Sequence, residues 1–206
     1  MKIAFALLAA LTLAPALAQA PAPIIKSATV RVVLTTSLGP ITLELEKQRA
    51  PITTANFLRY IDQKRFDGIT FYRASKVPGA PDFGFIQGGS QNDPKRTLPP
   101  IAHEPTSKTG VTHTDGTISM ARLAPGTARG DFIITLGPLP YLDANPGGPG
   151  DNFGNAAFGH VVEGIDIVRR IHASPASTSR GQGPMKGEML EPAVRVIAAR
   201  RVPVAR

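Results

Sequence analysis

Residues 71–89 read FYRASKVPGAPDFGFIQGG, and this stretch decides the fold. The runs Ile69–Arg73 and Phe85–Gly88 at its ends are short and mostly apolar or β-branched, which predicts two strands. Residues 74–84 between them contain Pro and Gly and predict a loop. Loops of this length in a compact domain usually carry function, so we expect a site beside this segment.

On the N-terminal side, the sequence predicts a β-hairpin followed by a helix. Apolar and polar residues alternate over residues 30–35 and again over residues 41–46, on either side of a turn that contains Gly39. Such period-two alternation is typical of paired strands with one buried face. Pro51 then suits the first turn of a helix, and Gly68 ends the apolar pattern that follows it.

On the C-terminal side, strands are predicted over Thr117–Ala121, Asp131–Leu136 and Ala193–Val202, and a second helix over Glu163–His172. Long segments rich in Pro, Gly and polar residues separate these elements. Strands and helices do not alternate along the chain. The fold class is therefore mainly β, and we expect one domain over residues 29–203, an antiparallel barrel with helices at its ends.

Residues 1–20 predict a cleaved signal peptide. Lys2 supplies a positive charge, Ile3–Leu13 form an apolar run, and Ala18-Gln19-Ala20 has the form of a signal-peptidase site. The run is too short for the roughly 20 residues that span a bilayer. We expect cleavage after Ala20, a flexible lead-in over residues 21–28, and a periplasmic protein without a membrane anchor.

The composition excludes several classes of site. The chain has 206 residues and no cysteine, which excludes a disulfide, a thiolate zinc site, a cysteine nucleophile and a lipoprotein anchor. Its 4 histidines lack metal-ligand spacing, and no phosphate-binding loop or serine-hydrolase motif occurs, so we expect no metal and no cofactor. The net charge is +8, but the basic residues are scattered without interleaved aromatics, so we expect no nucleic-acid binding.

Several blocks of the sequence, in the same order, resemble the cyclophilin family. The resemblance spans roughly residues 30–202 and implies a bacterial exported member of that family. It implies a closed eight-stranded antiparallel β-barrel capped by two α-helices, and peptidyl-prolyl cis–trans isomerase activity. The blocks are Pro51–Asp67, residues 71–89, TISMA at Thr117–Ala121, DFIIT at Asp131–Thr135, Tyr141-Leu142-Asp143, and FGHVVEGIDIVRRI at Phe158–Ile171.

The resemblance implies that Arg73 is the catalytic residue. An Xaa-Pro bond rotates over a barrier of about 20 kcal/mol. In the twisted transition state the prolyl nitrogen regains a lone pair, and a donor aimed at it stabilises that state alone. Arginine suits this role because it stays charged and holds its donors in a rigid plane.

The proline ring needs a dry apolar slot, and the resemblance also implies its walls. Phe85 and Ile133 are the stronger candidates because they alternate out of step with the core positions Ile86 and Phe132. For Phe132 itself the alternatives of wall and barrel core stay open, as they do for Phe158, and the choice between Phe83 and Phe85 as the floor is also open. The expected substrate-binding residues are Phe85, Gln87, Ala121, Arg122, Asp131, Ile133, Tyr141, Leu142 and Asn155.

Several positions depart from the pattern of the family. Asp131 matters most, because it stands where the family usually has Gln and would bring a carboxylate close to Arg73. We expect this carboxylate to orient the guanidinium; the alternatives are that it draws the donors away or faces solvent. The other departures are Tyr72 for His, Arg122 for Asn, Ile133 for Phe, Tyr141 for Trp and Asn155 for His.

The leading functional hypothesis is an isomerase that accelerates Xaa-Pro rotation in the folding of exported proteins. Its partners would be proline-containing unfolded or partly folded polypeptides, and we expect a monomer. A second hypothesis is a proline-peptide-binding module or chaperone on the same fold with little turnover. A third is a basic scaffold for an anionic polymer or envelope surface.

Overall fold

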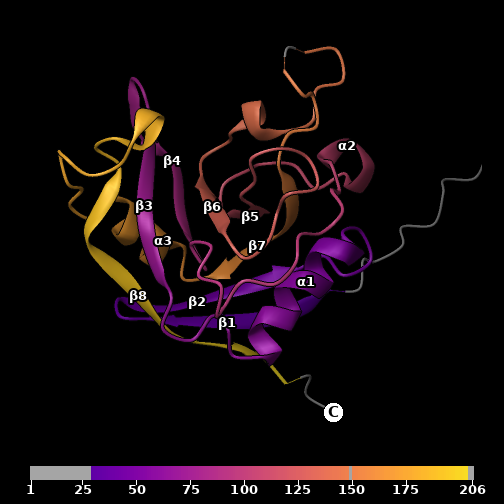
Figure 1. The fold of residues 1–206 in the computed structure, drawn as a ribbon, viewed down its shortest axis with the longest axis horizontal. Helices are drawn as coiled ribbons and strands as arrows, with labels where there is room; N and C mark the ends of the chain where they lie inside the picture. The colour runs from indigo at the N-terminus through magenta and orange to yellow at the C-terminus, as the bar shows by residue number, and fades with distance from the viewer. Residues whose placement is uncertain (1–28, 149, 204–206) are drawn as a thin grey trace, which may run out of the picture.

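The computed structural model describes residues 29–148 and 150–203 (Figure 1). Eight strands form a closed antiparallel barrel in the order β1-β2-β7-β5-β6-β4-β3-β8, which confirms the predicted fold class. The predicted signal peptide and lead-in lie outside the described residues. The strands are β1 (Val30–Thr36), β2 (Gly39–Leu45), β3 (Thr70–Val77), β4 (Ala80–Gly89), β5 (Thr117–Met120), β6 (Phe132–Leu136), β7 (Ala156–Glu163) and β8 (Met189–Arg201).

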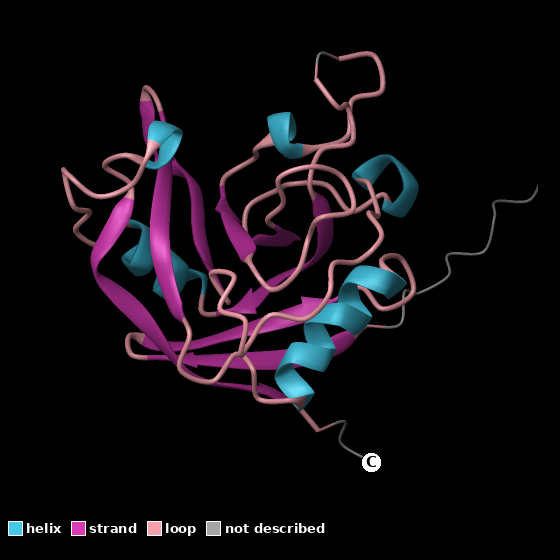
Figure 2. Ribbon diagram, viewed as in Figure 1, coloured by secondary structure: helices cyan, strands magenta, loops and turns pink. Residues whose placement is uncertain are grey.

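Within the described part of the chain, three α-helices accompany the barrel: α1 (Pro51–Asp62), α2 (Thr106–Thr109) and α3 (Ile165–His172). The two predicted helices are confirmed, and Figure 2 shows α1 and α3 on different sides of the barrel. The first turn of α1 lacks a local cap, and the buried carboxylate of Glu104 accepts hydrogen bonds from its free N–H groups instead. The single turn α2, inside a segment expected to be loop, was not predicted.

Aromatic rings fill the barrel around Phe57 of α1. The ring of Phe57 lies 5.3 Å from that of Phe132 and 5.2 Å from that of Phe158, and all three side chains are fully buried. Phe132 and Phe158 therefore belong to the core and form no wall of a surface slot.

The prediction of a loop over residues 74–84 is wrong, because β3 and β4 continue through it as one long hairpin. Ser75 pairs with Phe85 and Lys76 with Gly84, and only Pro78 and Gly79 remain as the turn. Pro78 and Gly79 form the tip of the hairpin, whereas Pro81 and Gly84 lie within β4, where the register with β3 shifts between the pairs Lys76–Gly84 and Val77–Ala80. Figure 1 shows β3 and β4 side by side, with the tip of this hairpin at the upper left.

Of the remaining strands, β1, β2, β5 and β6 agree with prediction to within a few residues, and β8 begins at Met189, four residues before the predicted Ala193. β7 was not among the strands predicted from periodicity. Two turns of 3-10 helix interrupt the long loops: η1 (Pro140–Leu142) and η2 (Gly183–Met185). Among the described residues, no helix has both the length and the apolar character needed to cross a membrane.

Candidate active site

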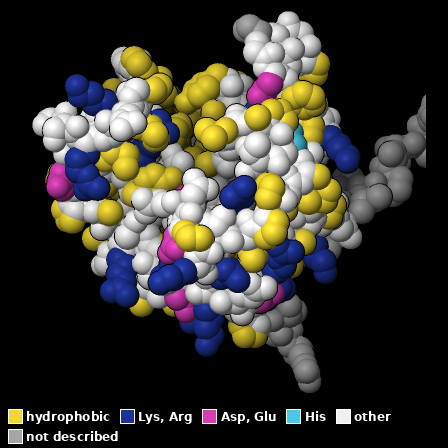
Figure 3. All heavy atoms as spheres, in the orientation of Figure 1, with side chains coloured by type: hydrophobic (Ala, Val, Ile, Leu, Met, Phe, Trp, Pro, Cys, Tyr) yellow, Lys and Arg dark blue, Asp and Glu magenta, His cyan; other side chains and the backbone are white. Residues whose placement is uncertain are grey.

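A second apolar cluster lies outside the barrel, on the outer face of β4 and β6. Phe85, Ile133 and Leu139 are buried in it, and Val77, Ala121 and Leu142 pack against it. The adjacent side chains Ile86 and Phe132 point into the barrel instead, as the period-two alternation predicted. Figure 3 shows hydrophobic side chains around a hollow between the β3–β4 hairpin and the loop that carries η1.

Phe85, rather than Phe83, forms the floor of this outer cluster. The guanidinium carbon of Arg73 lies 5.1 Å from the centroid of the Phe85 ring, a distance typical of a cation–π contact. The side chain of Phe83 is 44% exposed and lies next to Gly137.

Two side chains hold the guanidinium of Arg73. Its Nη1 donates to Oε1 of Gln87 over 3.0 Å. Its Nε donates to Oε2 of Glu188 over 2.7 Å, and Nη2 lies 2.7 Å from the same oxygen. Arg73 therefore stands at the edge of the apolar cluster with a fixed orientation.

The prediction that Asp131 pairs with Arg73 is wrong. Oδ1 of Asp131 accepts from the hydroxyl of Tyr72 over 3.2 Å and from the backbone N–H of Gln91 over 3.0 Å. Asp131 precedes β6 at the point where the chain meets the turn after β4, so its carboxylate is directed into that turn. Burial there raises the pKa of Asp131, and burial also raises the pKa of Tyr72.

Arg122 is committed to a neighbouring loop. Its Nη1 and Nη2 donate to the two carboxylate oxygens of Asp151 over 2.6 and 2.9 Å, and its Nε donates to the carbonyl of Gly154 over 2.7 Å. Hydrogen bonding to the guanidinium lowers the pKa of Asp151 to about 2. With Tyr141 and Asn155, Arg122 lines a cavity of about 450 Å³ beside the apolar cluster.

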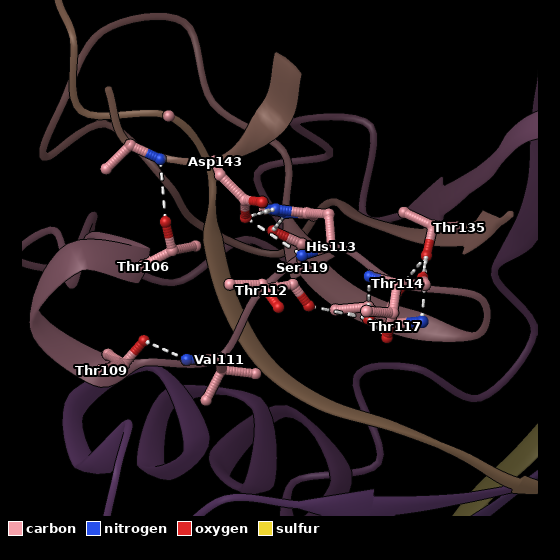
Figure 4. A network of polar contacts seen from close by, with 12 residues as sticks. Thr106, Thr109, Val111, Thr112, His113, Thr114, Thr117, Ser119, Thr135 and Asp143 are labelled. Atoms are coloured by element: carbon pink, nitrogen blue, oxygen red, sulfur yellow. Dashed lines mark hydrogen bonds and ion pairs between the residues drawn. The ribbon is translucent and has the colours of Figure 1, made fainter. Parts of the chain in front are cut away.

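A buried polar network ties η1 to the barrel (Figure 4). Nδ1 of His113 lies 2.6 Å from Oδ1 of Asp143, and Nε2 lies 2.9 Å from the hydroxyl of Ser119. Burial lowers the pKa of His113, so the neutral ring donates to the carboxylate and accepts from Ser119. Because Asp143 directly follows Tyr141 and Leu142, this network fixes the loop that borders the outer cluster.

Three residues of the site were not predicted from the sequence: Val77, Leu139 and Glu188. Val77 was placed in the wrongly predicted loop, and Leu139 lies in a segment without periodicity. Glu188 is 115 residues from Arg73 along the chain, and no spacing signal connects the two. Of the predicted residues, the structure gathers Arg73, Phe85, Gln87, Ala121, Ile133 and Leu142 around the outer cluster, with Tyr141, Arg122 and Asn155 beside it.

These features define a class: a closed β-barrel with a fixed arginine beside an apolar cluster on its outer face, a site suited to a proline ring. The family described as cyclophilin type peptidyl-prolyl cis-trans isomerase matches residues 31–197. The chain therefore belongs to the cyclophilin-type peptidyl-prolyl cis–trans isomerase family.

Individual relatives agree with this membership. The chain is 36% identical over 144 residues to peptidyl-prolyl cis-trans isomerase A of Dickeya dadantii, covering 68% of this chain and 70% of the relative. It is 36% identical over 152 residues to peptidyl-prolyl cis-trans isomerase cyp18 of Streptomyces antibioticus, covering 72% and 86%. A crystal structure of a cyclophilin type isomerase of Cryptosporidium parvum superposes with a TM-score of 0.69 at 19% identity, covering 86% of this chain and 100% of that one. This last likeness shows the shared fold.

Proposed function

We propose that this protein catalyses the cis–trans isomerisation of Xaa-Pro bonds in polypeptides that fold outside the cytoplasm. The observation that carries the proposal is the guanidinium of Arg73, held by Gln87 at the edge of the cluster formed by Phe85 and Ile133. A proline ring seated on the cluster would place its nitrogen within reach of the guanidinium.

The chemistry follows from this juxtaposition. The apolar side chains bind the proline ring in both isomers and so contribute binding energy without selecting the transition state. A guanidinium N–H aimed at the prolyl nitrogen finds a lone pair only when the peptide bond is twisted. This hydrogen bond therefore stabilises the twisted transition state and lowers the barrier to rotation, and it leaves the free energies of the planar cis and trans states unchanged.

We propose that the protein acts as a monomer in the periplasm and that its substrates are proline-containing polypeptides. A related structure of the Cryptosporidium protein was solved in the presence of the dipeptide Ala-Pro, which supports a site for proline-containing peptides. The periplasmic location is supported by the signal-peptide pattern of residues 1–20.

The test is an isomerisation assay on an Xaa-Pro peptide at low temperature, where the uncatalysed reaction is slow. We expect Arg73→Ala to lower the catalysed rate at least about tenfold, equivalent to about 1.4 kcal/mol of transition-state stabilisation. Arg169→Ala is the matched control, because Arg169 is exposed on α3 and pairs with Asp115. A folded wild-type protein that binds proline peptides without turnover would favour the binding-module hypothesis instead.

A further inference from the structure

The carboxylate of Glu188 occupies one edge of the Arg73 guanidinium. Oε2 of Glu188 lies 2.7 Å from Nε and 2.7 Å from Nη2 of Arg73, and both side chains are largely buried. Charge-assisted contacts of this length are stronger than neutral hydrogen bonds. This is the role that the sequence had suggested for Asp131, filled by a residue from a different part of the chain.

Glu188 is itself held in place. Its Oε1 accepts a hydrogen bond from the hydroxyl of Ser75 over 2.8 Å, and its backbone carbonyl accepts from the N–H of Ala74 over 2.9 Å. Its own N–H donates to the carbonyl of Met185 in η2 over 3.1 Å. The carboxylate is therefore anchored to β3, the same strand that carries Arg73.

The remaining donors of Arg73 point to its function. A guanidinium has five N–H donors. Nε donates to Glu188 and Nη1 donates to Gln87, while Nη2 lies at ion-pair distance from Glu188; this leaves one N–H on Nη1, and on Nη2 the N–H directed away from Glu188, without a hydrogen-bond partner among the described residues. The side chain of Arg73 keeps 16% of its surface exposed, so part of it remains open to a substrate.

We propose that Glu188 is a positioning residue for catalysis: it locks the guanidinium so that its two free donors face the prolyl nitrogen. The inference rests on the proposed isomerase function. Without the carboxylate, Gln87 would be the one described side chain that is still hydrogen-bonded to the guanidinium of Arg73. The guanidinium would then sample other orientations. The orientation matters in the transition state rather than in binding, so its loss should reduce kcat more than it changes KM.

Three variants test the role of Glu188 in the isomerisation assay. Glu188→Ala should lower kcat about five- to tenfold with KM within about twofold of wild type. Glu188→Gln keeps an oxygen acceptor for Arg73 and an amide that can bond Ser75, so kcat of this variant should fall by less than about threefold. Asp166→Ala removes one exposed acidic charge from α3 and serves as the control, with no change expected. A rate for Glu188→Ala within twofold of wild type, or above it, would overturn the proposal.

Two further measurements separate positioning from a merely structural role. In the Arg73→Ala background, Glu188→Ala should cause no additional loss, because its effect acts through Arg73; a further loss would overturn the proposal. If Glu188→Ala does not fold, Ser75→Ala takes its place, and we expect a two- to threefold loss in kcat that an unchanged rate would contradict.

An NMR readout keeps this inference distinct from the proposed function. The Nε–H signal of Arg73, assigned from its absence in Arg73→Ala, should move when Glu188 is replaced by Ala. A signal that does not move would contradict the pairing even if the wild-type protein is active. A wild-type protein without isomerase activity but with the expected shift would contradict the proposed function and leave the pairing established.

Discussion

Burial of a charged carboxylate destabilises the folded protein unless hydrogen bonds replace the lost hydration. For Asp131 they replace only part of it. Tyr72 and Gln91 donate hydrogen bonds to it, and these favour the charged form. Burial outweighs them, so the pKa of Asp131 is raised above its ordinary value. The folded protein thus favours the protonated acid more than the unfolded chain does.

We therefore expect Asp131→Asn to stabilise the protein at neutral pH. For a carboxyl group with a raised folded-state pKa, stability is fully present below the unfolded pKa and is lost as pH rises through the folded pKa. The amide keeps an acceptor for Tyr72 and Gln91 without the charge, so Tm at pH 7 should rise by roughly 2–4 °C, or about 1 kcal/mol.

Thermal unfolding of both proteins from pH 4 to pH 8 checks this expectation. The difference in Tm should grow with pH and shrink toward pH 4, where wild-type Asp131 gains its proton. Asp166→Asn, on the exposed face of α3, should show no such growth. A difference independent of pH would contradict the explanation by buried charge.

At the scale of single residues, local pattern predicted part of the site. Phe85 and Ile133 were predictable because a strand alternates faces, so a residue next to a core position points outward. Glu188 was not predictable, because it reaches Arg73 only when the barrel closes. Closure brings the segment before β8 next to β3, and no local pattern in the sequence reports this contact. Asp131 was placed at the right position and given the wrong partner, since its direction depends on the turn after β4.

At the scale of elements, the β3–β4 hairpin carries most of the site: Arg73 on β3, and Phe85 and Gln87 on β4. Gly84 permits its close pairing. Its φ is +145°, and a Cβ at this position would overlap the carbonyl oxygen of Ser75 on the facing strand. The residue after it is Phe85, so any separation of the strands here moves the floor of the outer cluster.

We expect Gly84→Ala to destabilise the hairpin by about 3 kcal/mol, because the strands must separate to admit the methyl group. For a domain of this size the loss corresponds to a fall in Tm of roughly 6–12 °C. Gly79→Ala is the matched control: its φ is +78°, but no atom lies within 4 Å of the added Cβ. The strain there costs about 1 kcal/mol.

Calorimetry of the two variants distinguishes contact from conformational strain. Isomerase activity should also fall further in Gly84→Ala than in Gly79→Ala, because Phe85 shifts only in the former. Equal losses of Tm in both variants would mean that the pairing of Ser75 with Phe85 does not constrain position 84.

The elements themselves were largely predictable, because hydrophobic periodicity reports which face each strand buries. The largest error lies where Pro and Gly occur inside a strand pattern. In residues 74–84, Pro78 and Gly79 form the turn of a two-stranded ribbon, whereas Pro81 and Gly84 lie within β4. Turn residues locate a reversal of the chain but not the length of the strands that meet there.

At the scale of the whole molecule, the core and the site are separate clusters on opposite faces of the same strands. The inner cluster fills the barrel with aromatic rings, whereas Phe85, Ile133 and Leu139 form the outer one. Replacing an outer residue therefore leaves the inner packing intact. This separation explains how Ile133 and Tyr141 can depart from the usual residues of the family while the barrel is retained.

We propose that residues 1–20 direct export of the whole protein, and we expect a full-length chain expressed in bacteria to be recovered from the periplasm with Pro21 at its N-terminus. The positive Lys2, the apolar run Ile3–Leu13 and the small residues Ala18 and Ala20 are the features that export and cleavage require. Mass spectrometry of periplasmic and cytoplasmic fractions measures the location of the protein and its N-terminal residue together.

Ala20→Lys places a long charged side chain at the cleavage site and should leave uncleaved protein, whereas Ala22→Lys, two residues beyond it, should be processed. Uncleaved wild-type protein confined to the cytoplasm would contradict the export proposal without affecting the assignment of the isomerase site, because that site lies entirely within residues 73–188.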